Sequence, residues 1–322
     1  MKNNDFTPKK LGGILNSTFK VYFKKFLSNF VVALVFMVIA AILMTPYFIS
    51  VFSLDVGVGY PFYDYSQGNM IAFILGLTLM SLAAYIILPS LLTGYFAPKT
   101  IDVLMLKQRD EKERRTILVK SFGRVALAKL SQLSLILIPI VIFAGLSAYY
   151  FADIGLTDMI YEISNIVIIF LIYMAFMFIV FIYVLLTVFT NQIAFFEDKK
   201  GFKAVFASIK LMAKGNFWVT LGHYLVFALI LSAAMYSVTI PLVVVISFAL
   251  IPSSLMIAGG GMTVLSIILI VLAACFMLCV SAIYYGLYEV FICHLYFNAR
   301  TRTEDIAFPG DDGEDKKEEL KK

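Results

Sequence analysis

The residues of this chain that could do chemistry inside an apolar setting are few. Glu289 is the only carboxylate deep within a long apolar segment, and Tyr285 precedes it by one helical turn. His223 lies at a similar depth in a second apolar segment, and Asn191 and Gln192 lie near the same level in a third. An ionisable side chain at membrane depth is costly and is by default a candidate functional group. These five residues form our candidate intramembrane polar pocket.

Two interpretations of this pocket stay open. In the first, Glu289 relays protons or cations, or it lines a pocket for a lipid head group. In the second, the same side chains form a hydrogen-bonded clamp between helices, for example between Glu289 and His223. At 1.5 Å of rise per residue, Glu289 lies about 9 Å from the end of its segment. Its side chain is therefore close enough to the membrane surface for either role.

Metal and cofactor chemistry finds little support in the residue pattern. The only histidines are His223 and His294, and the only cysteines are Cys275, Cys279 and Cys293. A structural zinc site needs four donors in tetrahedral reach, whereas a cysteine inside an apolar helix usually packs as a small apolar residue. Patterns typical of zinc proteases, nucleophile elbows, P-loops and dinucleotide-binding loops are missing from the sequence. We therefore expect no metal, no cofactor and no enzymatic activity.

A second set of candidate residues is basic and borders the apolar segments. Each such residue near an anionic membrane surface contributes on the order of 1 kcal/mol of attraction. The candidate anionic-lipid contacts are Lys20, Lys24, Lys25, Arg115, Lys120, Arg124, Lys210 and Lys214. The alternative interpretation is that these residues only set the topology and anchor the chain at the interface.

The composition indicates which elements must position these side chains. Of the 322 residues, 61% are hydrophobic and 15% are charged, and the mean hydropathy is +0.92. Soluble domains average about 45–50% apolar and about 25% charged residues. The excess excludes an ordinary soluble domain, a disordered chain and a disulfide scaffold. It predicts an all-α polytopic membrane protein.

The apolar segments predict a six-span membrane domain over 28–295. An amphipathic cytoplasmic segment, 1–27, precedes this domain, and a charged tail, 296–322, follows it and is expected to be disordered. The predicted spans are about 28–52, 70–97, 126–151, 163–195, 217–250 and 263–295.

The basic residues are confined to alternate segments of the chain. All 26 lysines and arginines lie in the N-terminal segment, in 98–129, in 196–215 or in the tail, and the three remaining loops have none. This is the positive-inside pattern, so we expect both termini on the cytoplasmic side of the cytoplasmic membrane. The net charge of +5 follows from this distribution, and we expect no nucleic-acid partner.

A weak internal repeat accompanies the charge pattern. Three times a basic amphipathic segment precedes a pair of spans, and Ser17, Ser121 and Ser208 align within these segments. One interpretation is a unit of one interfacial helix plus two spans, used three times. The other is that any cytoplasmic loop becomes basic and amphipathic without a repeat.

Three short runs carry a resemblance to a family. They are L-G-G-I-L-N-S-T-F-K-V-Y-F-K-K-F at Leu11–Phe26, K-G-N-F-W-V-T-L-G at Lys214–Gly222 and F-N-A-R-T-R at Phe297–Arg302. The chain resembles a poorly characterised family of bacterial and archaeal six-span membrane proteins, related to the membrane domain associated with glycerophosphodiester phosphodiesterases. The resemblance implies a helical bundle in the cytoplasmic membrane. It supplies no catalytic residues, because the phosphodiesterase chemistry belongs to a separate soluble domain.

These observations together favour a non-enzymatic integral membrane protein. We expect it to bind anionic inner-leaflet lipids or a membrane protein partner, including a second copy of itself, as a scaffold or accessory subunit. The alternative is a transporter, channel or lipid scramblase with a polar pocket near the cytoplasmic face.

Overall fold

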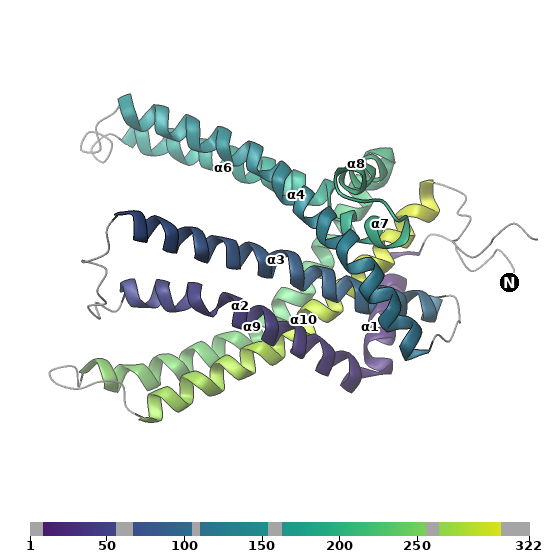
Figure 1. Cartoon of the computed structure of the whole chain (residues 1–322), viewed down its shortest axis with the longest axis horizontal. Coiled ribbons are helices and arrows are strands. Elements are labelled where there is room, and N and C mark those ends of the chain that lie inside the picture. Colours follow the sequence, from purple (N-terminus) through teal and green to yellow (C-terminus); the bar gives the residue numbers. More distant parts are fainter. Residues whose placement is uncertain (1–8, 56–66, 105–109, 154–162, 256–263, 304–322) are drawn as a thin grey trace, which may run out of the picture. The chain divides into compact units, whose positions relative to one another are not determined.

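The computed structural model describes residues 9–55, 67–104, 110–153, 163–255 and 264–303. Nearly all of them are helical, and no strand occurs within these ranges (Figure 1). The prediction of an all-α chain is therefore confirmed.

The helices follow one another with few interruptions. They are α1 (Leu11–Lys24), α2 (Phe26–Asp55), α3 (Gln67–Leu104), α4 (Glu111–Asp153), α6 (Ile163–Leu186), α7 (Thr190–Phe196), α8 (Phe202–Leu211), the kinked turn η3 (Met212–Asn216), α9 (Phe217–Leu255) and α10 (Val264–Thr303). Within the described residues, six helical stretches are long and apolar enough to cross a membrane. The protein is thus a polytopic membrane protein, as predicted.

The chain divides into two compact units, each of which is described by itself. One unit consists of Met1–Lys9, Lys120–Leu221 and Leu295–Lys322, and the other of Lys10–Val119 and Gly222–His294. We call them unit 1 and unit 2.

Unit 2 is built around α2 and α3, which lie side by side (Figure 1). Tyr22 of α1 is fully buried and its ring stacks on Phe96 of α3 at 6.0 Å between centroids. Gly286 of α10 allows this packing, because a Cβ atom there would lie 2.5 Å from Tyr22 Cε2. Phe227 of α9 stacks on Phe291 of α10 at 3.8 Å. Within this unit, aromatic side chains thus pack α1 against α3 and α10, and α9 against α10.

Unit 1 pairs α4 with α6 through polar and aromatic contacts. The Tyr183 hydroxyl donates to the Gln132 carbonyl at 2.5 Å, and Gln132 Nε2 donates to Thr187 Oγ1 at 2.7 Å. Farther along the same helices, the rings of Phe143 and Phe176 stack at 4.5 Å. Since side-chain hydrogen bonds inside an apolar medium have no water to compete with, these bonds fix the rotation of α6 against α4.

Large apolar side chains remain exposed along the spans, as a membrane setting requires. Leu137 and Val141 on α4, Phe178 on α6 and Leu229 on α9 are all more than half exposed. Soluble proteins seldom expose contiguous apolar surface of this extent. These faces are therefore suited to contact lipid tails.

The three basic amphipathic segments do not all join their spans in the same way. α1 ends at Lys24, because the backbone of Lys25 leaves the helical region (φ −132°, ψ 51°). α8 ends in η3, where Gly215 has φ 90°. The middle segment, by contrast, has no such break, and α4 runs through it into the span without interruption. Only the first and third segments are separate helices.

Two helices continue beyond the predicted ends of their spans. α3 continues to Leu104, beyond the predicted end at 97, and its buried Asp102 is paired with Arg114 at 2.9 Å. The described residues of the predicted tail, 296–303, are helical, because α10 continues to Thr303 and Tyr296 is buried. In both places a buried polar side chain binds another residue, Asp102 to Arg114 and the Tyr296 hydroxyl to Glu197. Residues 304–322 lie outside the described chain.

The fourth predicted span, 163–195, is not one helix. It is interrupted between Leu186 and Thr190, and the Ser208 hydroxyl lies at the interruption. Ser208 Oγ accepts a hydrogen bond from the Phe189 N–H at 3.2 Å and donates to the Leu186 carbonyl at 2.9 Å. The hydroxyl thereby replaces backbone bonds that the break removes.

Candidate functional site

The five residues of the predicted intramembrane pocket belong to both units. Glu289 is 4% exposed on α10, Tyr285 is 39% exposed one turn before it, and His223 is half-buried on α9 in the same unit. Asn191 is half-buried and Gln192 is fully buried on α7 of unit 1. The structure therefore places three of the residues in unit 2 and two in unit 1, and the pocket stays a prediction.

The basic residues predicted to meet lipid are almost all at the surface. Lys20, Lys24, Lys25, Arg115, Lys120, Lys210 and Lys214 are exposed. The exception is Arg124, which is half-buried and forms an ion pair with Asp198. This ion pair connects α4 to the segment between α7 and α8.

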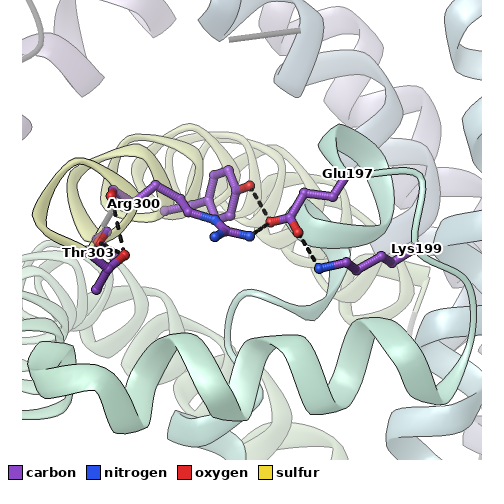
Figure 2. Close-up of polar contacts among 6 residues, drawn as sticks. Glu197, Lys199, Arg300 and Thr303 are labelled. Carbon is purple, nitrogen blue, oxygen red and sulfur yellow. Dashed lines mark hydrogen bonds and ion pairs between the residues drawn. The ribbon is translucent and has the colours of Figure 1, made fainter. Parts of the chain in front are cut away.

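Glu197 organises a polar cluster that the sequence analysis missed. It follows α7 directly, and its Oε1 accepts hydrogen bonds from the Arg300 guanidinium and, at 2.8 Å, from the Tyr296 hydroxyl. Its Oε2 accepts a hydrogen bond from Lys199 Nζ at 2.7 Å. Figure 2 shows the two basic side chains reaching the carboxylate from different elements, Arg300 from α10 and Lys199 from the segment before α8. We call these four residues the Glu197 cluster.

The electrostatics of the Glu197 cluster favour an ionised carboxylate. Burial raises the pKa of the Glu197 carboxyl, but hydrogen bonds from Lys199, Arg300 and Tyr296, with the charge of Arg300, outweigh it. The net result is a pKa below its usual value. Glu197 is therefore a permanent anion at neutral pH that holds two cations in place.

Aromatic packing supports the same cluster. The Tyr296 ring stacks on Phe196 at 5.4 Å with 19° between the planes, and it meets Phe189 edge-on at 5.9 Å. Tyr296 is 4% exposed, so the hydroxyl that donates to Glu197 has a fixed position. Aromatic side chains from α10, from α7 and from the break before α7 thus pack next to the charged groups of the cluster.

The end of α8 is fixed by an asparagine rather than by a charged residue. Asn216 Nδ2 donates to the Leu211 carbonyl at 3.0 Å and to the Ala299 carbonyl at 3.2 Å. Asn216 is only 2% exposed. It therefore ties the kink after α8 to the last turns of α10, where Arg300 lies.

A small basic cavity that is partly open to the surface lies beside this cluster in unit 1. Its volume is about 110 Å³. It is lined by Lys199, Ala207, Lys210, Leu211, Lys214 and Arg300. Lys210 and Lys214 are among the predicted lipid contacts, whereas Lys199 and Arg300 are not. We call this space the basic cavity.

The sequence contained one unused signal for this site. Glu197 and Asp198 form an acidic pair at the start of a segment, 196–215, that is otherwise basic. Both carboxylates turn out to bind cations from other helices, Glu197 to Arg300 and Asp198 to Arg124. An acidic pair inside a basic cytoplasmic segment can therefore indicate a buried ion-pair site.

The described residues offer no cluster of three or more histidine, cysteine or carboxylate side chains that could hold a metal ion. Cys275 is exposed, Cys279 is half-buried and Cys293 is buried along α10.

Comparisons with known proteins do not assign this chain to a family. No protein-family model matches the sequence. No curated protein and no solved structure is similar to it at a significant level. Function must therefore be argued from the residues themselves.

Proposed function

We propose that this protein is a non-enzymatic scaffold or accessory subunit of the cytoplasmic membrane. In this proposal it binds anionic lipid head groups of the inner leaflet through its basic interfacial helices. The observation that supports this proposal best is that α1 and α8 are amphipathic. One face of each helix is buried in the protein while lysines occupy the other.

The faces of α1 illustrate the argument. Ile14, Val21 and Tyr22 are buried, whereas Lys20 and Lys24 are exposed. On α8, Ala204 and Val205 are buried while Lys203 and Lys210 are exposed. Because each helix is already anchored by its apolar face, its lysines can meet head groups without a further ordering cost for the backbone.

The inside orientation follows from the charge distribution of the sequence. Short loops rich in lysine and arginine stay on the cytoplasmic side, where the leaflet carries anionic lipids. In the proposed orientation α1, α8 and the end of α10 all face that leaflet. The family resemblance carried by Leu11–Phe26, Lys214–Gly222 and Phe297–Arg302 is part of the same proposal.

The test is lipid retention by the purified full-length protein. We expect native mass spectrometry after gentle solubilisation from mixed vesicles to show enrichment of phosphatidylglycerol over phosphatidylcholine. Changing Lys20, Lys24 and Lys25 to Gln should reduce the enrichment several-fold. The matched control changes Lys316, Lys317 and Lys321 to Gln, which removes the same charge from the terminal segment. Equal retention of both lipids by the wild-type protein would contradict the proposal.

A second candidate function, transport of protons or cations, is supported by the burial of Glu289 within α10. Its test is pH-dependent flux into vesicles that contain the protein. Exchanging Glu289 for Gln should abolish this flux, and unchanged flux in the variant would rule the relay out.

A further inference from the structure

A row of phenylalanine rings runs along unit 2 from α1 into α2. Phe19 stacks on Phe23 at 6.1 Å between ring centroids, and Phe23 stacks on Phe26 at 5.5 Å. Phe26 in turn stacks on Phe30 of α2 at 5.8 Å. In all three pairs the ring planes lie within 22° of parallel. We call these four residues the aromatic row.

The aromatic row lies at the surface of unit 2, and its back is packed against a buried tyrosine. Phe23 is 50% exposed and Phe26 is 37% exposed, whereas Tyr22 is fully buried. The Tyr22 ring meets Phe23 edge-on at 5.5 Å and Phe26 at 6.1 Å. Because the packing of Tyr22 against α3 and α10 fixes the rotation of α1, the exposed edge of the row has a fixed direction.

The row occupies a sector of α1 that is separate from the lysines. Phe19 and Phe23 are four residues apart, so they lie on one face of the helix. Lys20 and Lys24 each follow by one residue, so they lie about 100° farther round the helix axis. Both lysines are exposed, as is Phe23. α1 therefore presents phenyl rings along one line and ammonium groups along another.

The row continues into an apolar face of the span α2. Leu27 directly follows Phe26, and Leu27, Val31 and Val35 are exposed at intervals of four residues. α2 is one of the helices that are long and apolar enough to cross a membrane. A span exposes such a face to the acyl chains of the bilayer, because no water is present there to meet it. The aromatic row thus adjoins a surface suited to lipid.

The helix break at Lys25 places the row at the edge of this surface. The backbone of Lys25 leaves the helical region, so α1 turns away from the axis of α2 (Figure 1). A helix that turns at the end of a span, with phenyl rings and lysines on separate lines, suits the plane of the membrane interface. A partner in the cytoplasm could cover α1, but it could not follow the row onto the span.

We propose that the aromatic row is a lipid-binding surface that inserts α1 into the boundary between head groups and acyl chains. Phe19, Phe23 and Phe26 contact the acyl chains near their ester groups, while Lys20 and Lys24 lie among the phosphates. This inference rests on the proposed function and deepens it. It adds the apolar part of the lipid to the anionic head group as a ligand of α1.

The experiment measures quenching of tryptophan fluorescence in the full-length protein. Trp218 is the only tryptophan of the chain, so Trp218→Phe gives a background without this signal. In this background Phe23→Trp places the probe in the row. Lys24→Trp is the matched control, because it changes the neighbouring exposed residue on the lysine line. The vesicles are made of phosphatidylcholine, with or without bromine atoms on the acyl chains near the ester groups. Iodide, present on both sides of the membrane, is the quencher in water.

We expect brominated lipid to quench the Phe23→Trp variant at least about twofold more strongly than the Lys24→Trp variant, because bromine quenches only at close contact with the acyl chains. Iodide should quench the two variants in the reverse order. Phe26→Trp, on the other side of the helix break, should behave like Phe23→Trp, so the test does not depend on a single substitution. Circular dichroism and gel filtration check that each variant is folded.

Three outcomes would overturn this inference. If iodide quenches the Phe23→Trp and Phe26→Trp variants and brominated lipid does not, the row faces the cytoplasm. If neither quencher reaches these two positions, a protein surface covers the row. If brominated lipid quenches the Phe23→Trp and Lys24→Trp variants equally, α1 has no preferred side toward the acyl chains.

The failure of the proposed function is a different result. Insertion of the row into phosphatidylcholine vesicles, without enrichment of phosphatidylglycerol by the wild-type protein, would contradict anionic head-group binding and leave the row as a lipid surface. Enrichment of phosphatidylglycerol without quenching of the row by brominated lipid would keep the proposed function and overturn the inference.

Discussion

Two junctions of the chain are similar in kind but differ in their contacts. One lies between α1 and α2, and the other lies between α8 and α9. Each joins a basic amphipathic helix to a membrane span, and each uses a buried asparagine. Asn29 Nδ2 donates to the Tyr22 carbonyl at 2.7 Å in unit 2, and Asn216 Nδ2 donates to the Leu211 carbonyl at 3.0 Å in unit 1. Both asparagines therefore bind a carbonyl near the end of the amphipathic helix that precedes them.

The two junctions differ in what happens to their cations. In unit 2, Lys99 Nζ donates to Asn29 Oδ1 at 2.8 Å and also to the Tyr95 hydroxyl, so this lysine is used within the packed junction. In unit 1, Asn216 binds the Ala299 carbonyl, and Lys210 and Lys214 line a cavity. At one junction a lysine binds the asparagine, and at the other two lysines border a small cavity.

This difference teaches that similar basic amphipathic segments need not share a function. The aligned serines make the same point. Ser17 Oγ donates to the Gly13 carbonyl of its own helix at 2.8 Å in an exposed position, whereas the fully buried Ser208 bridges the α6–α7 break. The weak repeat in the sequence thus does not correspond to repeated contacts at these two serines.

The largest expected effect comes from a substitution that disturbs the packing of α1 and α3 against α10 in unit 2. Gly286→Ala would place a Cβ atom 2.5 Å from Tyr22 Cε2 and 3.2 Å from Phe96 Cζ, and both rings are buried. We expect a loss of about 1–3 kcal/mol in the free energy of unfolding, because an overpacked site can only relax by shifting its neighbours. Reversible unfolding in mixed micelles with sodium dodecyl sulfate measures it.

The matched control for this variant is Gly222→Ala. A Cβ atom at Gly222, in α9, would meet nothing within 4 Å. Its stability should be unchanged or slightly higher, since alanine favours a helix over glycine. Equal destabilisation by the two substitutions would show that the close approach of Tyr22 to α10 does not matter for stability.

A smaller effect on stability is expected to distinguish Ser208 from the aligned Ser17. Ser208→Ala removes the hydroxyl that binds the Phe189 N–H and the Leu186 carbonyl. Leaving these backbone groups without that partner should cost about 2 kcal/mol of unfolding free energy. Hydrogen exchange should rise around the α6–α7 break in the same variant.

Ser17→Ala is the control for the serine comparison. Its bond to the Gly13 carbonyl is local and exposed, so the loss should be less than about 0.5 kcal/mol. Similar losses for both variants would mean that the serines are equivalent after all, and this result would favour the repeat interpretation.

The smallest effect sharpens the description of the Glu197 cluster. Because the folded-state pKa of Glu197 lies below its usual value of 4.5, its contribution to stability is fully present above pH 4.5. That contribution is lost as the pH falls through the lower folded-state pKa. We expect Glu197→Gln to cost about 1 kcal/mol at neutral pH and to flatten the acid limb of the stability curve.

Measuring unfolding of wild type and Glu197→Gln between pH 3 and pH 7 tests the sign. The two curves should converge at the acid end, where the wild-type carboxyl is protonated. Curves that stay parallel over the whole range would show that the charge of Glu197 does not stabilise the cluster.

The amino-acid sequence by itself determined the class of the molecule. Long apolar runs predicted six spans, and the structure contains six helices of that kind within its described residues. This succeeds because the length and hydropathy of a span depend only on composition along the chain. The basic segments could be located for the same reason, and seven of the eight predicted lipid contacts are exposed.

Only the tertiary structure decided which of these residues act together. The Glu197 cluster joins residues that are about a hundred positions apart in the sequence, as in the pair of Glu197 with Arg300. Helix rotation and helix breaks, such as those at Lys25 and Gly215, determine whether a lysine faces solvent, an asparagine or a cavity. These features depend on packing between distant segments, and hydropathy along the chain carries no information about it.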